Sequence, residues 1–270
     1  PAPPVTPPAP PAGQLALPSD PIAHFRRGRW DLVSGTWPND GTQGGSASFS
    51  ASTAPLTEVL VDGHGALGAA VPALRGVGDS VGTATSVINF GSVIKSTFTI
   101  CSATRYSGGR KSRILNGGGV NWFHGHHSAD GGVAYYDGWK TVSSGGNVSP
   151  DDDWVLMCGS NGGAELKIAN GVDVGTDTGG TGGATLYING GSYVSASDFD
   201  VAEVITWDRG LSVQEAWSAY YYLEYAVFRE STAPPSPLSP PLPPPAPPLP
   251  PLIPPSPPFV PASLPSGAVA

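Results

Sequence analysis

The middle of the chain alternates short apolar runs with clusters of Gly, Asn, Asp and Ser. The runs are rich in β-branched and aromatic residues, a pattern typical of the strands of an antiparallel sandwich. Two of them end in Asn-Gly, at Asn170-Gly171 and Asn189-Gly190, a dipeptide that favours tight turns. We therefore expect an all-β domain with strands at residues 58–61, 85–90, 96–106, 112–115, 132–136, 154–158, 165–169, 185–188 and 200–207.

One helix is expected near the end of this domain. Ser212 is followed three residues later by Glu215, which is the spacing of a capping box, and Leu211 can pack against Ala216 as a hydrophobic staple. Apolar residues then recur at helical spacing as far as about Phe228. We expect the whole stripe to pack against the sandwich; it consists of Val213, Ala216, Trp217, Tyr220, Leu223 and Val227.

Proline is concentrated at the two ends of the chain. Of the 31 prolines, nine lie in residues 1–21, eighteen in residues 234–265 and four in between. Such a run can form neither a helix nor a central strand, so it favours a polyproline II rod, here on the order of 100 Å long. We therefore expect a Pro-rich N-terminal arm at 1–21, a globular domain at 22–230 and a polyproline II tail at 231–270.

The tail also carries apolar side chains at the three-residue period of polyproline II. They form two ridges, which run through Ala246, Leu249 and Leu252 and then through Ile253, Ser256 and Phe259. An apolar ridge on a bare rod suggests that something packs on it, so Leu249, Leu252, Ile253 and Phe259 are candidate assembly residues. The alternative is sequence drift in a linker.

Charge and hydropathy exclude two classes of partner. The formal net charge is −8 and the pI is near 4.9, so no basic face is available to neutralise nucleic acid phosphates. No run of about 18 apolar residues occurs, so we expect no membrane span. Because the sequence has neither an initiator Met nor a signal peptide, we interpret it as a portion of a longer precursor.

The order of features along the middle domain resembles that of a known family. The features are Trp30-Asp31, residues 37–41 (WPNDG), residues 97–100 (TFTI), a Trp- and Gly-rich stretch at 121–139, and residues 202–212 before the helix. Together they resemble a laminin-G-like jelly-roll domain of the concanavalin A-like lectin and glucanase superfamily. The resemblance implies two curved antiparallel sheets and a concave face on which relatives often bind sugar, sometimes with calcium.

The Pro-rich arms resemble a different group. Residues 234–237 (PPSP) and 254–258 (PPSPP) are similar to the hydroxyproline-rich glycoproteins of plant and green-algal walls and cilia, in which prolines are hydroxylated and carry short glycans. A plain Pro/Ser linker is the alternative. The candidate hydroxylation and O-glycosylation sites are Thr6, Ser236, Pro237, Ser239, Pro240, Pro244, Pro248, Pro255, Ser256 and Pro258; Asn147 begins the one N-glycosylation sequon.

The two cysteines, Cys101 and Cys158, lie in apolar strand-like runs. We expect one disulfide between them in an oxidising compartment, with two buried free thiols as the alternative. The Pro-rich arms favour secretion independently, so the expected location is extracellular or at the cell surface, in a wall, a matrix or a cilium.

Several residues are candidates for binding. Aromatic rings stack on sugar faces when they are exposed, so the carbohydrate-binding candidates are Trp122, His124, Tyr135 and Trp139. The nearby histidines, His124, His126 and His127, lack the further ligands that a zinc site needs, and we expect them to be polar loop residues at the rim of the sandwich. Asp151 and Asp153 are weak calcium candidates, and otherwise no cofactor is expected.

The acidic residues do not suggest an enzyme. Glycoside hydrolases need two carboxylates across the scissile bond, and the nearest approach to that pattern is Asp200 and Glu203. Because these residues differ by an odd number, a regular strand directs them to opposite faces. We therefore expect no catalytic residues.

Two functions remain. In the first, the protein is a structural subunit of an extracellular glycoprotein fibre, matrix or ciliary-surface filament, in which jelly-roll heads are linked head-to-tail by Pro-rich arms and the partner is a second copy of the chain. In the alternative, the domain is a carbohydrate-binding lectin on a glycosylated Pro-rich stalk.

Overall fold

The computed structural model describes residues 16–50, 54–62, 70–78, 85–193 and 195–228. Most of the two Pro-rich arms lies outside the described residues. The expectations that concern Thr6, the tail sites between Ser236 and Pro258, and the assembly ridges from Leu249 to Phe259 therefore stay predictions, as does the polyproline II conformation.

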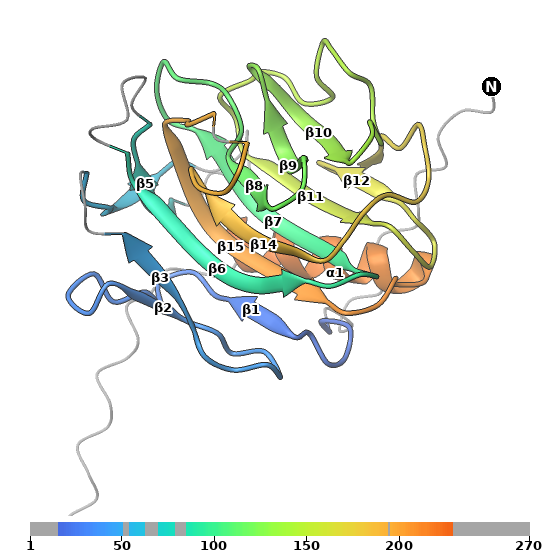
Figure 1. Cartoon of the computed structure of the whole chain (residues 1–270), viewed down its shortest axis with the longest axis horizontal. Helices are drawn as coiled ribbons and strands as arrows, with labels where there is room; N and C mark the ends of the chain where they lie inside the picture. Colours follow the sequence, from blue (N-terminus) through green and yellow to red (C-terminus); the bar gives the residue numbers. More distant parts are fainter. Residues whose placement is uncertain (1–15, 51–53, 63–69, 79–84, 194, 229–270) are drawn as a thin grey trace, which may run out of the picture. The chain divides into compact units, whose positions relative to one another are not determined.

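Two antiparallel sheets form a sandwich (Figure 1). The eight-stranded sheet contains, in spatial order, β13 (Val172–Asp173), β12 (Lys167–Ala169), β11 (Val155–Ser160), β7 (Thr99–Tyr106), β15 (Phe199–Trp207), β5 (Val71–Gly76) and β4 (Thr57–Val61), with β1 (Ala23–Phe25) paired to β15. The seven-stranded sheet contains β10 (Asp130–Tyr136), β9 (Trp122–His127), β8 (Leu115–Gly118), β14 (Ala184–Ile188), β6 (Val87–Ile94), β3 (Ser46–Ser50) and β2 (Thr36–Pro38).

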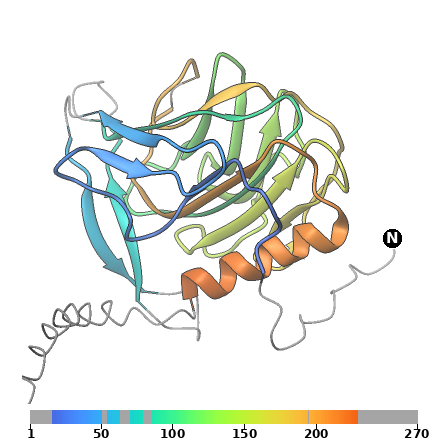
Figure 2. The same cartoon turned by 90° about the horizontal axis from the view of Figure 1, so that it is seen from below.

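The helix α1 (Val213–Phe228) packs on the outer face of the eight-stranded sheet (Figure 2). The expectation of an antiparallel all-β sandwich with one C-terminal helix is confirmed. All nine expected strand ranges overlap observed strands, although residues 112–115 meet β8 only at Leu115. The apolar pattern missed β1, β2, β3, β5, β9 and β13, because these strands are short, are rich in Gly, His and Ser, or, in β5, contain a proline (Pro72).

The inter-sheet core is rich in aromatic rings. Phe25, Trp37 and Phe90 pack together, with Phe25 edge-on to both of the others at centroid distances of 5.9 and 4.9 Å. Edge-to-face contacts add stabilisation beyond the apolar area that the rings bury. Trp37 is fully buried and its Nε1 donates to the carbonyl of Arg26, so its one polar group is satisfied.

A second core lies between α1 and the eight-stranded sheet. Ala219 and Leu223 of the helix are fully buried in the same cluster as Ile205 and Trp207 of β15. Indole Nε1 of Trp207 lies within hydrogen-bond distance of the carbonyls of Pro18 and Ser19, which fixes the start of the described chain to this layer.

The capping box that begins α1 is present. The backbone N–H of Ser212 donates to Glu215, and the backbone N–H of Glu215 donates to the Ser212 hydroxyl, at 2.9 and 3.3 Å. Arg209 makes two further bonds to the Glu215 carboxylate, and these bonds hold the pKa of Glu215 down at about 2. One part of the expectation is wrong: Val213 does not pack on the sandwich but is 57% exposed.

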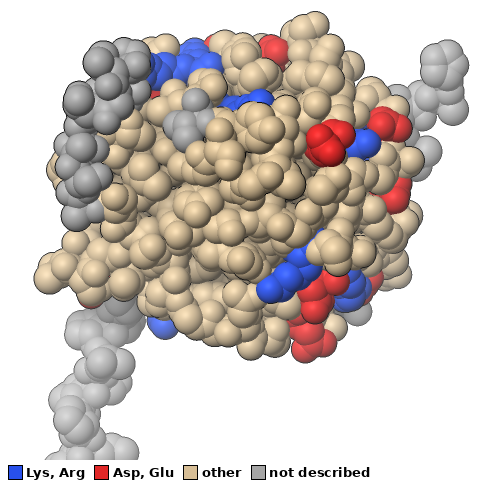
Figure 3. All heavy atoms as spheres, in the orientation of Figure 1, with Lys and Arg blue, Asp and Glu red and all other residues tan. Residues whose placement is uncertain are grey.

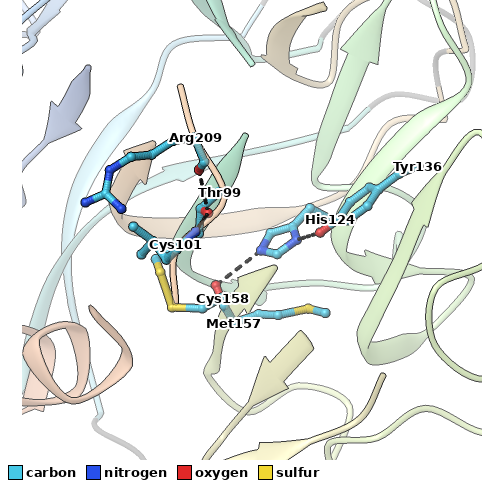
Figure 4. The surroundings of a disulfide bond; sticks show 8 residues. Thr99, Cys101, His124, Tyr136, Met157, Cys158 and Arg209 are labelled. Carbon is cyan, nitrogen blue, oxygen red and sulfur yellow. Dashed lines mark hydrogen bonds between the residues drawn. A yellow bond between two sulfur atoms is a disulfide. The ribbon is translucent and has the colours of Figure 1, made fainter. Parts of the chain in front are cut away.

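The expected disulfide between Cys101 and Cys158 is present beneath the helix (Figure 4). The two cysteines are direct cross-strand partners in β7 and β11, and both are buried. They are 57 residues apart, so the bond closes a long loop in the unfolded chain. On the chain-entropy model a loop of that size is worth about 4 kcal/mol.

Replacing both cysteines by alanine should therefore lower the free energy of unfolding by about 4 kcal/mol. The measurement is urea unfolding of the native chain and of the Cys101→Ala/Cys158→Ala variant, each with and without a reductant. The reductant should weaken the native chain and leave the variant unchanged. A loss below about 1 kcal/mol would contradict the long-loop argument.

Candidate functional site

The two outer faces of the sandwich differ. Helix α1 covers one, whereas no described helix covers the outer face of the seven-stranded sheet. Figure 3 views the molecule from this second side, where the middle of the surface is uncharged and the Lys, Arg, Asp and Glu side chains lie mainly toward its margins. An uncharged open face suits an uncharged ligand better than an ionic one.

The side chains of strand β9 point alternately toward the inter-sheet core and toward this open face. Trp122 is fully buried in the inter-sheet core and is the strand partner of Tyr136, which is buried there too. The next residue, Phe123, pairs with Tyr135 on the outer face. The alternation of a strand thus places neighbouring aromatic residues on opposite sides of the sheet.

Four rings make an aromatic platform on the outer face. The platform consists of Phe123, His127, Tyr135 and Trp139. Phe123 is the buried floor, with the Tyr135 ring stacked at 5.5 Å, the His127 ring at 4.6 Å and the Trp139 ring edge-on at 5.4 Å. The other three rings are half-buried, so each shows part of its surface to solvent.

An arginine completes the platform. The Arg113 guanidinium lies 4.8 Å from the centroid of Phe123 and 6.0 Å from that of Tyr193, a ring that is 48% exposed. Partial burial lowers the pKa of Arg113. Half-exposed rings beside N–H donors can stack on the apolar face of a ring-shaped ligand and donate hydrogen bonds to its edge.

The structure divides the four carbohydrate-binding candidates into two pairs. Tyr135 and Trp139 lie in the platform, with ring centroids 5.6 Å apart. Trp122 and His124 are fully buried in the core, so a surface ligand cannot reach either of them, and the expectation for this pair is corrected. Sequence reasoning missed Phe123, His127 and Arg113, because residues 122–127 (WFHGHH) do not show an apolar and polar alternation.

The expectation that the histidines are loop residues at the rim is also wrong. His124 and His126 lie in β9 and are fully buried. Nε2 of His124 donates to the Met157 carbonyl at 3.2 Å, so its Nδ1 accepts from the Tyr136 hydroxyl at 2.8 Å (Figure 4). Gly125 hid this strand from the sequence pattern, because its φ of +91° is a conformation that favours glycine.

Burial also keeps both histidines neutral. It lowers the pKa of His124 to about 4 and that of His126 to about 3, because a charged imidazole loses its hydration in the core. His126 has one partner, the Thr104 hydroxyl at 3.3 Å, and its Nε2 has none among the described residues.

The weaker candidates are engaged in local contacts. Asp151 forms an ion pair with Lys111 at 2.7 Å, and Asp153 accepts the backbone N–H of Trp154. Within the described ranges no three His, Cys, Asp or Glu side chains gather as a metal site would require. The Asn147 amide donates to the carbonyl of Gly132, and its glycosylation stays a prediction.

A β-bulge changes the interpretation of Asp200 and Glu203. The register of β15 against β7 shifts between Val201 and Glu203, so both carboxylates lie on the helix-covered side of the sheet and not on opposite faces. Both are buried and paired: Asp200 accepts two bonds from Arg75, at 2.8 and 2.9 Å, and Glu203 accepts one from His24 at 2.7 Å.

Comparisons with known proteins support the fold. No protein-family model matches the chain, and no curated protein does. Among solved structures it is similar to domain 4 of AbnA, a GH43 extracellular arabinanase from Geobacillus stearothermophilus, in complex with arabinotriose. The identity is 12%, the match covers 74% of this chain and 98% of that one, and the TM-score is 0.50. At this identity the likeness shows the β-sandwich fold alone.

Two further solved structures match with TM-scores below 0.5. Trypanosoma rangeli sialidase in complex with 2,3-difluorosialic acid is 13% identical, with 83% of this chain and 36% of that chain covered and a TM-score of 0.48. The binding domain of Paraclostridial Mosquitocidal Protein 1 is 11% identical, with 76% and 52% covered and a TM-score of 0.45. The chain thus spans about a third of the sialidase.

The buried histidines predict that acid weakens the fold. Unfolded histidine has a pKa near 6.5, so below that pH the unfolded chain takes up protons that folded His124 and His126 do not. Stability is therefore lost as the pH falls from 6.5 toward 4, by about 2 kcal/mol per histidine at pH 5. Urea unfolding at pH 7 and pH 5 measures the difference.

A substitution separates this effect from general acid sensitivity. His126→Gln should remove about 2 kcal/mol of the pH 7 to pH 5 difference, whereas His127→Gln, at a half-buried ring, should remove less. If His126→Gln leaves the difference unchanged, His126 is not neutral in the fold.

Proposed function

We propose that the protein is a structural subunit of an extracellular fibre, in which the sandwich is a bead and the Pro-rich arms connect successive beads. The observation that carries this proposal is the placement of proline: nine of the 31 lie in residues 1–21 and eighteen in 234–265. Fixed φ angles make such arms stiff, so they hold beads at a set spacing.

The structure supports this role by where the arms attach. Leu17, near the start of the described chain, packs in the same core as Phe228, the last described residue. Both arms therefore begin at the helix-covered layer, which leaves the open face of the seven-stranded sheet free of both attachments. A disulfide in that layer stabilises the part of the bead from which the arms depart.

The burial and pairing of the carboxylates of Asp200 and Glu203 support a role without catalysis. A glycoside hydrolase needs an acid and a base that reach the substrate, but Asp200 and Glu203 are buried and bonded to Arg75 and His24. The disulfide is typical of an oxidising compartment, which agrees with an extracellular location. In the part of the chain that the structure describes, no helix is long and apolar enough to cross a membrane.

The test is whether the full chain assembles through its tail. In sedimentation velocity over a range of concentrations, the chain should form species larger than a monomer, and electron microscopy should show periodic filaments. A matched variant in which residues 234–265 are replaced by Gly/Ser of equal length should stay monomeric. A native chain that is monomeric at every concentration would contradict the proposal.

The aromatic platform favours a second candidate function, carbohydrate binding. Trp139 and Tyr135 are half-buried rings in the same cluster as Phe123, whose ring lies beside the donors of Arg113. The arabinanase domain of similar fold was solved in complex with arabinotriose. We infer that an uncharged oligosaccharide is the class of ligand that this platform fits.

The platform is tested by glycan binding. Trp139→Ala should weaken binding of an uncharged oligosaccharide by at least about fivefold, since stacking on one ring is worth about 1 kcal/mol or more. Tyr225→Ala, which removes an exposed ring from the helix, is the matched control and should bind as the native chain does. If a broad glycan panel contains no ligand for the native chain, this candidate fails.

A further inference from the structure

Helix α1 carries a second row of apolar side chains that the sheet covers only in part. The helix stripe consists of Val213, Trp217, Tyr221 and Tyr225, each four residues after the last. Val213 is 57% and Tyr225 42% exposed, and the two residues between them are half-buried. Since i and i+4 residues are neighbours on a helix surface, the four form one continuous row.

Trp217 and Tyr221 pack in part against the core beneath the helix, whereas Val213 and Tyr225 remain exposed. One apolar face suffices to hold a helix on a sheet, and Ala216, Ala219, Leu223 and Val227 already supply that face. The rings of Trp217 and Tyr221 lie 5.9 Å apart, so the stripe presents adjoining aromatic surfaces. A contiguous row of exposed apolar side chains marks a docking surface.

Residues 231–270 carry no charged side chain. The four stripe residues are uncharged as well, and the polar residues beside them are Gln214, Ser218 and the charged Glu224. The tail itself therefore loses no hydration of a charged group when it docks, a loss that is costly for a buried charge. Exposed aromatic rings are the surface on which polyproline segments are commonly read.

In the polyproline II conformation that the sequence predicts, each ridge of the tail would match the stripe in length. From Val213 to Tyr225 is 12 residues, or about 18 Å along the axis of a helix. Each apolar ridge of the tail, from Ala246 to Leu252 and from Ile253 to Phe259, covers six residues, or about 19 Å of polyproline II. One ridge of the tail, with three side chains, would therefore be about as long as the stripe, with its four side chains.

We propose that the helix stripe is the docking surface for the Pro-rich tail, residues 234–265, of a second copy of this chain. The proposal rests on the proposed function and identifies the contact that links one bead to the next. Trp217, Tyr221 and Tyr225 receive the proline rings and the ridge that contains Leu249 and Leu252.

The proposed function explains why the partner is a second copy. No glycine occurs between Phe228 and Gly267, and the eighteen prolines of 234–265 restrict the backbone throughout. In the proposed fibre, the contact that links two beads is made between copies, so the tail of one chain docks on the helix of the next. The contact is head-to-tail, which generates an open filament.

The test compares full-length variants with the native chain by sedimentation velocity. Tyr225→Ala, and more strongly Tyr225→Ala with Trp217→Ala, should raise the dissociation constant of self-association at least tenfold. Tyr193→Ala is the matched control, because its ring is 48% exposed on the opposite side of the bead, and it should associate as the native chain does. Thermal unfolding verifies that each variant is folded.

A variant of the tail tests the other half of the proposed contact. Leu249→Ser with Leu252→Ser should weaken association to a similar extent, and combining it with Tyr225→Ala should cost less than the product of the separate effects, as contacting residues do.

If the Gly/Ser tail abolishes association but the stripe variants do not weaken it, the docking inference fails while the fibre function stands. A monomeric native chain overturns both. A stripe variant that releases the tail within a monomer contradicts the second copy as partner.

Discussion

The burial of strand β15 on both of its faces is the constraint on which the rest of the structure depends. All nine of its residues are buried, because Phe199, Val201 and Val204 face the inter-sheet core while Ala202, Ile205 and Trp207 face helix α1. Any acidic group on such a strand must be paired, since an isolated buried charge is costly. Asp200 and Glu203 are paired, and the capped helix and the disulfide lie in the same layer.

This constraint makes the bead asymmetric. One sheet is closed by α1, from whose layer both arms leave, and the other sheet presents the aromatic platform. The two exposed aromatic surfaces differ in chemistry. The platform combines rings with the Arg113 guanidinium, which suits a ligand with hydroxyl groups, whereas the helix stripe is apolar and suits proline rings. A fibre subunit can use both, one for its neighbour and one for attached or surrounding glycans.

Features that depend on local sequence could be predicted, and those set by tertiary contacts could not. The helix and its capping box follow from spacing and apolar periodicity. The disulfide was expected from two cysteines in apolar runs together with an oxidising compartment, with two free thiols as the alternative. The direction of Trp122 and His124 could not be predicted, because Gly125 with φ +91° makes β9 resemble a loop. The bulge in β15 could not be predicted either, because it is defined only by the pairing of β15 with its partner strand. It places Glu203 on the same side of the sheet as Asp200, contrary to the expectation. Val213 was wrongly expected to pack, since periodicity does not say how much of a helix its sheet covers.

The most direct test is electron cryomicroscopy of the native material, with a three-dimensional reconstruction of the filament that the proposal predicts. The account predicts a continuous polyproline rod from one copy lying along Trp217, Tyr221 and Tyr225 of the next bead, on the outer side of α1. Beads whose rods cross the seven-stranded sheet instead, or that touch no rod at all, would contradict it.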